Sequence, residues 1–251
     1  MHSLSIISLA LAASSMLVNA YPSGASLARR DLAADEIIVW GSNGRVEVMN
    51  KTEYYNELAS SNITIGRPES GNTTTTTTSS NTTSSLVRRS CKSRTVIKEL
   101  DDEEFLNWDV AMSSVVHATD ESASVSVTEG YSISNTLSVS VSASLTIVED
   151  FLSTTFGVDY SESWSSSYTS SYTFTVPAGK YGVVVSNPQT IRHSGYVYTG
   201  CVGAMTEEAY YQGDSYTSKA YGGLSWVEGT ISLCTGTTYP VPRCIGSGSL
   251  S

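Results

Sequence analysis

The stretch Ser122–Ile147, SASVSVTEGYSISNTLSVSVSASLTI, decides the fold class of this 251-residue chain. Eleven of its thirteen odd-numbered positions are apolar, and twelve of its thirteen even-numbered positions are Ser or Thr. This alternation of period two predicts β-structure, because an amphipathic helix repeats every 3.6 residues. Fully extended, the stretch would reach about 80 Å. We therefore expect either a break at Gly130 or Asn135 or a very elongated sheet.

A second alternating run follows with the opposite parity. Its apolar members occupy even positions: Phe156, Val158, Tyr160, Trp164, Tyr168, Tyr172, Phe174 and Val176. The parity changes between Val148 and Thr155, as a turn or a bulge would cause. We therefore predict two long antiparallel strands joined near Glu149–Thr155, with one apolar, aromatic face and one face of hydroxyls.

Such a hairpin has two interpretations. A strand that crosses a membrane alternates lipid-facing apolar residues with water-facing polar residues over about 9–11 residues. Uncharged Ser and Thr suit the water-facing side and also allow the segment to lie on a soluble sheet beforehand. A plain β-sandwich, apolar inside and Ser/Thr-rich outside, shows the same alternation. The alternation alone does not distinguish the two.

The sequence that closes this pair of strands carries a family resemblance. YTFTVPAGKYG at 172–182, followed by Val183–Val185, resembles the pore-forming module of aerolysin-type toxins, a group with epsilon-toxin, mosquitocidal-toxin and fungal secreted relatives. In that family a Ser/Thr-rich insertion hairpin is flanked by long strands, and a turn like Val176–Gly179 commonly follows the second strand. The resemblance covers about residues 120–187 and implies an elongated antiparallel sheet.

By position, the resemblance places the insertion hairpin at 137–172, with Phe151 and Leu152 near its tip. Its membrane-facing residues would be Leu137, Val139, Val141, Leu145, Ile147, Phe151, Leu152, Phe156, Tyr160, Trp164, Tyr168 and Tyr172. Two features depart from the family pattern. No N-terminal lectin domain is recognisable, and the segment carries the carboxylates Glu149, Asp150, Asp159 and Glu162. These charges would either line a water-filled lumen or prevent insertion.

The N-terminus predicts export and processing. An apolar stretch from Leu4 to Val18 precedes a small-residue cleavage site after Ala20, which is typical of a secretory signal peptide at 1–20. The dibasic pairs Arg29-Arg30 and Arg88-Arg89 are candidate processing sites, because exposed polar segments are where nicking concentrates. Cleavage after Arg30 would remove a short propeptide, 21–30. We expect an extracellular protein.

The segment between the dibasic pairs predicts a glycosylated tether. All four N-glycosylation sequons of the chain lie there, at Asn50, Asn62, Asn72 and Asn81. Residues 69–85 are almost entirely Gly, Asn, Thr and Ser, a composition that buries too little apolar area to fold. We expect 31–89 to be a pro-segment or an accessory hairpin with a linker, and 90–251 to be the main all-β domain.

Four cysteines predict two disulfides. An even number in an exported chain favours disulfides, and Cys91, Cys201, Cys234 and Cys244 allow three connectivities. Zinc is the alternative, but no CxxC spacing occurs and only His117 and His193 follow the signal peptide. All four cysteines lie after Arg89, which supports a domain boundary there.

Composition excludes several function classes. The chain has 45 Ser and 28 Thr but only 15% charged residues, unlike a charge-rich intracellular enzyme or a coiled coil. A formal net charge of −10 argues against a nucleic-acid partner. No cofactor or metal is indicated, and no GxSxG elbow supports a nucleophilic serine. We therefore expect a protein without enzymatic activity.

The remaining expectation concerns the target. We expect a secreted toxin or virulence effector that oligomerises on target membranes and inserts the hairpin. The chain also resembles the small disulfide-bonded effectors that fungi secrete into hosts. The alternatives are a non-lytic protein that binds cell-wall or surface carbohydrate, or an effector that docks a host protein. Aromatic residues after Pro188 would either stack on sugars or pack a small core: Tyr196, Tyr198, Tyr210, Tyr211, Tyr216, Tyr221 and Trp226.

Overall fold

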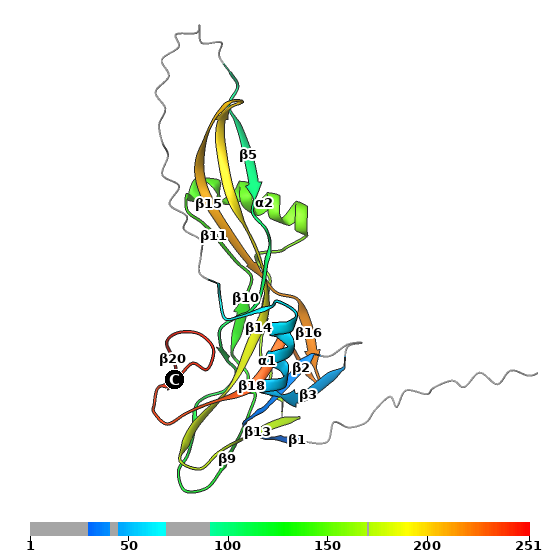
Figure 1. Cartoon of the computed structure of the whole chain (residues 1–251), viewed down its shortest axis with the longest axis vertical. Coiled ribbons are helices and arrows are strands. Elements are labelled where there is room, and N and C mark those ends of the chain that lie inside the picture. Colours follow the sequence, from blue (N-terminus) through cyan, green and yellow to red (C-terminus); the bar gives the residue numbers. More distant parts are fainter. Residues whose placement is uncertain (1–29, 41–44, 69–90, 170) are drawn as a thin grey trace, which may run out of the picture.

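The computed structural model describes residues 30–40, 45–68, 91–169 and 171–251 (Figure 1). Strands make up 53% of these described residues, and α1 and α2 are the α-helices among them. The predicted all-β class is therefore confirmed. The signal peptide, Arg29, Arg88, Arg89, Asn72 and Asn81 lie outside the described residues.

One strand runs through nearly the whole length of the molecule. Strand β14, Lys180–Cys201, has 22 residues and lies at the centre of an 11-stranded sheet (Figure 1). On one edge it pairs antiparallel with β18, Gly229–Gly236, along its first part and with β15, Ala204–Ser215, along its second part. The elongated antiparallel sheet predicted from the sequence is thus present.

The opposite edge of β14 is covered by one broken chain segment. Four short strands follow each other antiparallel to it: β5 (Arg94–Glu99), β6 (Glu103–Leu106), β7 (Val110–Ala111) and β8 (Val116–Ala118). The segment 94–118 is longer than the segment 180–200 that it faces. Its surplus residues lie at the breaks between these strands, so pairing resumes after each break.

The partner of β14 changes from β18 to β15 next to Pro188. Proline has no N–H to give to a ladder, so it belongs at such an interruption. Gly229 faces Pro188 across the sheet with φ +142°, and a Cβ there would collide with the backbone of Asn187 and Pro188. This close approach of the two backbones requires glycine at the first position of β18.

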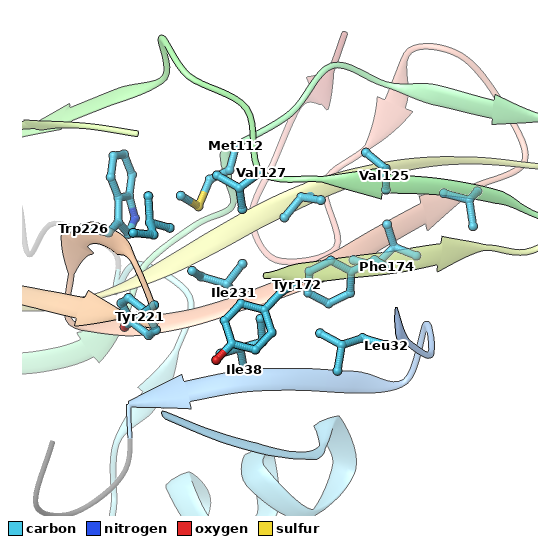
Figure 2. Close-up of a cluster of buried hydrophobic side chains, with 14 of the residues drawn as sticks. Leu32, Ile38, Met112, Val125, Val127, Tyr172, Phe174, Tyr221, Trp226 and Ile231 are labelled. Atoms are coloured by element: carbon cyan, nitrogen blue, oxygen red, sulfur yellow. The ribbon is translucent and has the colours of Figure 1, made fainter. Parts of the chain in front are cut away.

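The lower half of the molecule in Figure 1 surrounds the first part of β14, residues 180–188, and the upper half surrounds its second part. The lower half contains the largest core. Strands β2 (Glu36–Trp40) and β3 (Val46–Asn50) extend the sheet beyond β18, and a second sheet packs against it, with order β1 (Arg30–Leu32), β13 (Tyr172–Val176), β9 (Ala123–Ser126). Figure 2 shows Leu32 and Ile38 beside Tyr172 and Phe174 in this core. The other strands of this half are β4 (Thr64–Ile65), β16 (Ser218–Tyr221), β17 (Leu224–Val227), β19 (Val241–Pro242) and β20 (Ser249–Leu250).

The N-terminal strands therefore share a core with the rest of the chain. The interpretation of 31–89 as a pro-segment or an accessory hairpin with a linker stays a prediction. Strand β2 pairs antiparallel with β18, and Leu32, Ile37 and Ile38 are buried. Helix α1, Lys51–Ser60, begins after Asn50, whose side chain accepts a hydrogen bond from the N–H of Thr52. Its Lys51 Nζ donates to the carbonyl of Leu233 in β18.

The two predicted disulfides are present, and the structure selects one connectivity. Cys91 pairs with Cys201 at the far end of β14, and Cys234 pairs with Cys244 in the lower half. The first bond spans 110 residues of sequence and the second spans 10. Neither bond joins 31–89 to the rest of the chain, so only non-covalent contacts would hold this segment after a cut at Arg89.

This arrangement predicts the fate of the cut protein. After cleavage at Arg89 by a dibasic-specific protease, we expect the N-terminal fragment to stay bound through β1, β2 and α1. The measurement is gel filtration under native conditions, with separation expected only in denaturant. Ile38→Ala should weaken the association by about 2–5 kcal/mol, the usual cost of such a core truncation. Glu47→Ala, at a partly exposed position of β3, is the matched control. Separate elution of the unmodified fragments would contradict the shared core.

Candidate functional site

The candidate site is the segment predicted to form the amphipathic hairpin, residues 122–176, which we call the arm. Its two runs do lie antiparallel: β9 pairs with β13, and β10 (Ser132–Ser134) pairs with β12 (Ser163–Ser165). Between β10 and β12 the chain forms β11 (Thr136–Val139), the 3₁₀ helix η2 (Ser142–Ser144) and α2 (Leu145–Phe156).

The prediction of one continuous hairpin is wrong in this middle part. Residues 145–156 are helical, and β11 pairs with β15 of the main sheet instead of with the second run. Leu137 lies opposite Gly213, whereas a hairpin centred within 137–172 would have placed it opposite Tyr172. The predicted turn at Glu149–Thr155 is inside α2.

The physical reason is a second periodicity in the same residues. Leu145, Val148, Leu152 and Phe156 recur at spacings of three and four, the period of one helix face. The extended conformation therefore ends near Val141, although the alternation of apolar and hydroxyl residues continues in the sequence as far as Ile147. Gly157 ends the helix in the left-handed conformation, φ +71°, which is the usual C-terminal cap.

Helix α2 rests on the upper part of the sheet through a small apolar cluster. Val148 and Leu152 are fully buried against Val197 of β14 and against Ala209 and Tyr211 of β15. The rest of the helix is exposed: Leu145, at the start of the packed face, is 40% exposed, Ile147 is 44% exposed, and Glu149 and Asp150 face solvent. The helix thus has one packed side and one side that mixes apolar and acidic groups.

The predicted membrane-facing residues fall into three groups. Leu137, Val139, Val141, Phe151, Leu152, Phe156 and Tyr160 gather in or around the α2 cluster. Trp164 and Tyr172 pack with the lower core, and Trp164 Nε1 donates to Ser218 Oγ at 2.6 Å. Leu145, Ile147 and Tyr168 are exposed, the last of them by 63%. The structure therefore brings together the residues nearest α2 and separates the rest.

A buried charged cluster lies where the upper and lower halves meet. The Arg192 guanidinium donates to both carboxylate oxygens of Asp214 at 2.6 and 2.9 Å, and both side chains are almost fully buried. Burial opposes the charge of Arg192, but the hydrogen bonds and charge of Asp214 outweigh it and raise the pKa of Arg192. Next to Arg192, His193 Nδ1 lies 2.7 Å from Asp102 Oδ1 and its ring stacks on Phe156 at the end of α2, with 3.9 Å between centroids.

Sequence reasoning missed this cluster. Its signal is the Arg192-His193 pair inside a run of strand residues, because charged residues are almost never fully buried unless they are paired. The partner residues Asp102 and Asp214 are distant in sequence. Only the pairing of β14 with β6 and β15 identifies them.

The tyrosines predicted either to stack on sugars or to pack a core divide into a buried and a partly exposed group. Tyr211, Tyr221 and Trp226 are fully buried. Tyr196, Tyr198 and Tyr210 are partly exposed on the face of the upper sheet away from α2, and their rings lie 5.4–6.4 Å apart. These three form a short exposed aromatic row.

Potential metal ligands meet at one place among the described residues, Asp109 with Cys234 and Cys244. The two cysteines form a disulfide, and the Asp109 carboxylate accepts hydrogen bonds from Asn187 Nδ2 and from the N–H groups of Cys244 and Ile245. This group is therefore a structural junction that holds the C-terminal loop.

Comparison with known proteins found no matching family model, no similar curated protein and no similar solved structure. Neither of the α-helices in the described part of the chain has the length and apolar character needed to cross a membrane.

The contact under α2 predicts a pH-dependent stability. The Tyr211 hydroxyl is buried without a hydrogen-bond partner among the described residues, and burial raises its pKa to about 12. The unfolded chain loses this proton near pH 10, so stability falls between about pH 10 and 12, where only the folded form keeps it. Tyr211→Phe should be about 1 kcal/mol more stable than the wild type at pH 8. This difference in stability should be larger at pH 11, because only the wild type is destabilised by the ionisation of Tyr211 in its unfolded chain.

Urea unfolding at both pH values measures this difference. Tyr196→Phe, on the exposed row, is the control and should change little. A Tyr211→Phe protein that is less stable than the wild type at pH 8 would mean that the hydroxyl has a partner after all.

Proposed function

We propose that this protein is a secreted toxin or virulence effector of the aerolysin-like type, which oligomerises on a target membrane and inserts part of the arm. The single observation that carries the proposal is the construction of the arm. Two antiparallel strand pairs, rich in Ser and Thr, hold a helical connection that rests on the main sheet through a small cluster.

The balance of contacts favours release of the middle part of the arm, residues 136–156. The cluster under α2 contains five buried residues, whereas the lower core contains sixteen. Regions with fewer buried apolar contacts open at a lower free energy than the whole molecule. Helix α2, η2 and β11 can thus leave the sheet while the lower core stays folded. The cost is the loss of the β11–β15 pairing and of the Phe156–His193 stack.

Once released, the same residues have a pattern suited to a membrane strand. Leu137–Ile147 is as long as a strand that crosses a bilayer, about 9–11 residues, and it alternates apolar side chains with Ser and Thr. Glu149 and Asp150 would then lie at the turn, where carboxylates can remain in water. Without a membrane, the segment 145–156 forms a helix, because the sheet is then the only apolar surface against which its apolar side can pack.

Secretion and oligomerisation belong to the same proposal. The two disulfides suit an oxidising compartment and agree with the predicted signal peptide. Strands β5 and β11 each pair with one neighbour in the described residues, so the upper sheet has two edges with free backbone groups. Such edges are templates for pairing with another copy.

A disulfide staple tests the proposal. Ser138 in β11 and Gln212 in β15 are direct partners in the register, so their Cα atoms lie within the reach of a disulfide. Oxidised Ser138→Cys/Gln212→Cys should abolish dye release from liposomes of target-cell lipids, because β11 can no longer leave the sheet. The matched control, Ser132→Cys/Ser165→Cys, joins two residues within the arm and should leave release intact.

Each single-cysteine variant, blocked with iodoacetamide, shows the effect of the substitution without the link. The proposal fails if the unmodified protein releases no dye from any of several membranes, both intact and cut at Arg89. It also fails if the staple across β11 and β15 leaves release unchanged.

A second candidate function, non-lytic binding of surface carbohydrate, is favoured by the exposed row of Tyr196, Tyr198 and Tyr210. Aromatic faces beside hydroxyls suit sugar rings, and Ser138 and Ser140 lie next to Tyr210 around a cavity of about 360 Å³. On a glycan array, Tyr196→Ala/Tyr210→Ala should lose binding that the wild type shows. Tyr239→Ala, an exposed tyrosine elsewhere, is the control. An array that the wild-type protein does not bind would remove this candidate.

A further inference from the structure

A cavity of about 480 Å³ lies beside the arm in the lower half of the molecule. Distant parts of the chain form its walls: Arg67 after β4, Asn107 and Trp108 between β6 and β7, strand β10 of the arm, Tyr216, and Arg243 in the C-terminal loop. Its size is that of an ordinary small-ligand site. It is separate from the row formed by Tyr196, Tyr198 and Tyr210.

Two guanidinium groups line this cavity in a chain whose formal net charge is −10. The Nε of Arg243 is buried and has no hydrogen-bond partner among the described residues. A ligand cannot reach this enclosed atom, but Arg243 makes no other side-chain hydrogen bond or ion pair among the described residues, so its terminal N–H groups can bind an acceptor in the cavity. Arg67 is 44% exposed and lies over the Trp108 ring, with its Cζ 5.6 Å from the ring centroid. Trp108 therefore helps to hold this second guanidinium in place.

The acidic groups near the cavity are already engaged. Asp109 accepts three hydrogen bonds, from Asn187 Nδ2 and from the N–H groups of Cys244 and Ile245. Asp214 is held by Arg192 in the bidentate pair and lies 3.6 Å from Arg67. Arg243 has no ion pair among the described residues. An anionic group on the ligand suits this site, since guanidinium binds a carboxylate through two parallel hydrogen bonds.

The rest of the lining suits a sugar. Ser132, Ser134 and Thr136 present exposed hydroxyls along one wall. Apolar surface comes from Ile133, Val110 and the partly buried Tyr216 ring. A saccharide offers hydroxyls for the first set and C–H faces for the second, whereas a bare anion would use neither.

We propose that this cavity binds an acidic saccharide, with the sugar carboxylate at Arg243 and Arg67 and the sugar hydroxyls along Ser132–Thr136. Because β10 is part of the arm, the bound sugar would contact the arm directly. Binding at this site does not require membrane insertion, so the inference stands apart from the function proposed above.

Isothermal titration of the full-length protein tests the site with three probes: sodium glucuronate, glucose and inorganic phosphate. We expect binding of glucuronate only. Arg243→Gln should weaken it by about tenfold or more, the usual effect of losing a hydrogen bond to a charged group. Arg67→Gln should weaken it less, because Arg67 is shared with Asp214. Arg45→Gln, at an exposed arginine of the β2–β3 hairpin, should leave binding unchanged.

Three outcomes would overturn the proposal: no binding of glucuronate, equal binding of glucose or phosphate, or binding that neither Arg67→Gln nor Arg243→Gln weakens. Melting curves show whether each variant is folded. Should Arg243→Gln be destabilised by its position beside Cys244, Arg67→Gln at its more exposed site decides the question.

Discussion

The backbone hydrogen bonding of β14 is the constraint on which the rest of the structure depends. A buried strand must pair the N–H and C=O groups on both edges, and this strand is 22 residues long. No single partner covers it, so one edge is shared by β18 and β15 and the other by β5, β6, β7 and β8. The elongated form of the molecule follows directly (Figure 1).

The change of partner on β14 also creates the junction between the two halves. Above Pro188 the strand passes from the large lower core to the thin upper sheet, where α2 covers one face. Arg192 and Asp214 occupy this junction as a buried pair. Such a pair adds little net stability over apolar residues, but removing one partner leaves an unpaired buried charge. We interpret it as a device that keeps β14 and β15 in one register, since a slip would separate the charges.

The arm combines two incompatible periodicities. Residues 145–147 continue the alternation of a strand, while Leu145, Val148, Leu152 and Phe156 form one face of a helix. In the folded chain the helix is favoured, because Val197, Ala209 and Tyr211 offer an apolar surface that fits it. The strand pattern remains in the sequence, and the proposed function rests on this coexistence. The saccharide proposed for the cavity at β10 would contact the same arm.

The sequence by itself determined the all-β class, the elongated sheet, the antiparallel direction of the two alternating runs and the presence of two disulfides. Each depends on local patterns or on a count, which the chain carries without knowledge of its neighbours. The tertiary structure decided the disulfide connectivity, the helix at 145–156, the incorporation of β1–β3 into the main core and the residues that meet around Arg192 and Arg243. These features depend on segments far apart in sequence, because burial and pairing are set by whichever surfaces meet in space. A local alternation cannot specify which surface will cover it.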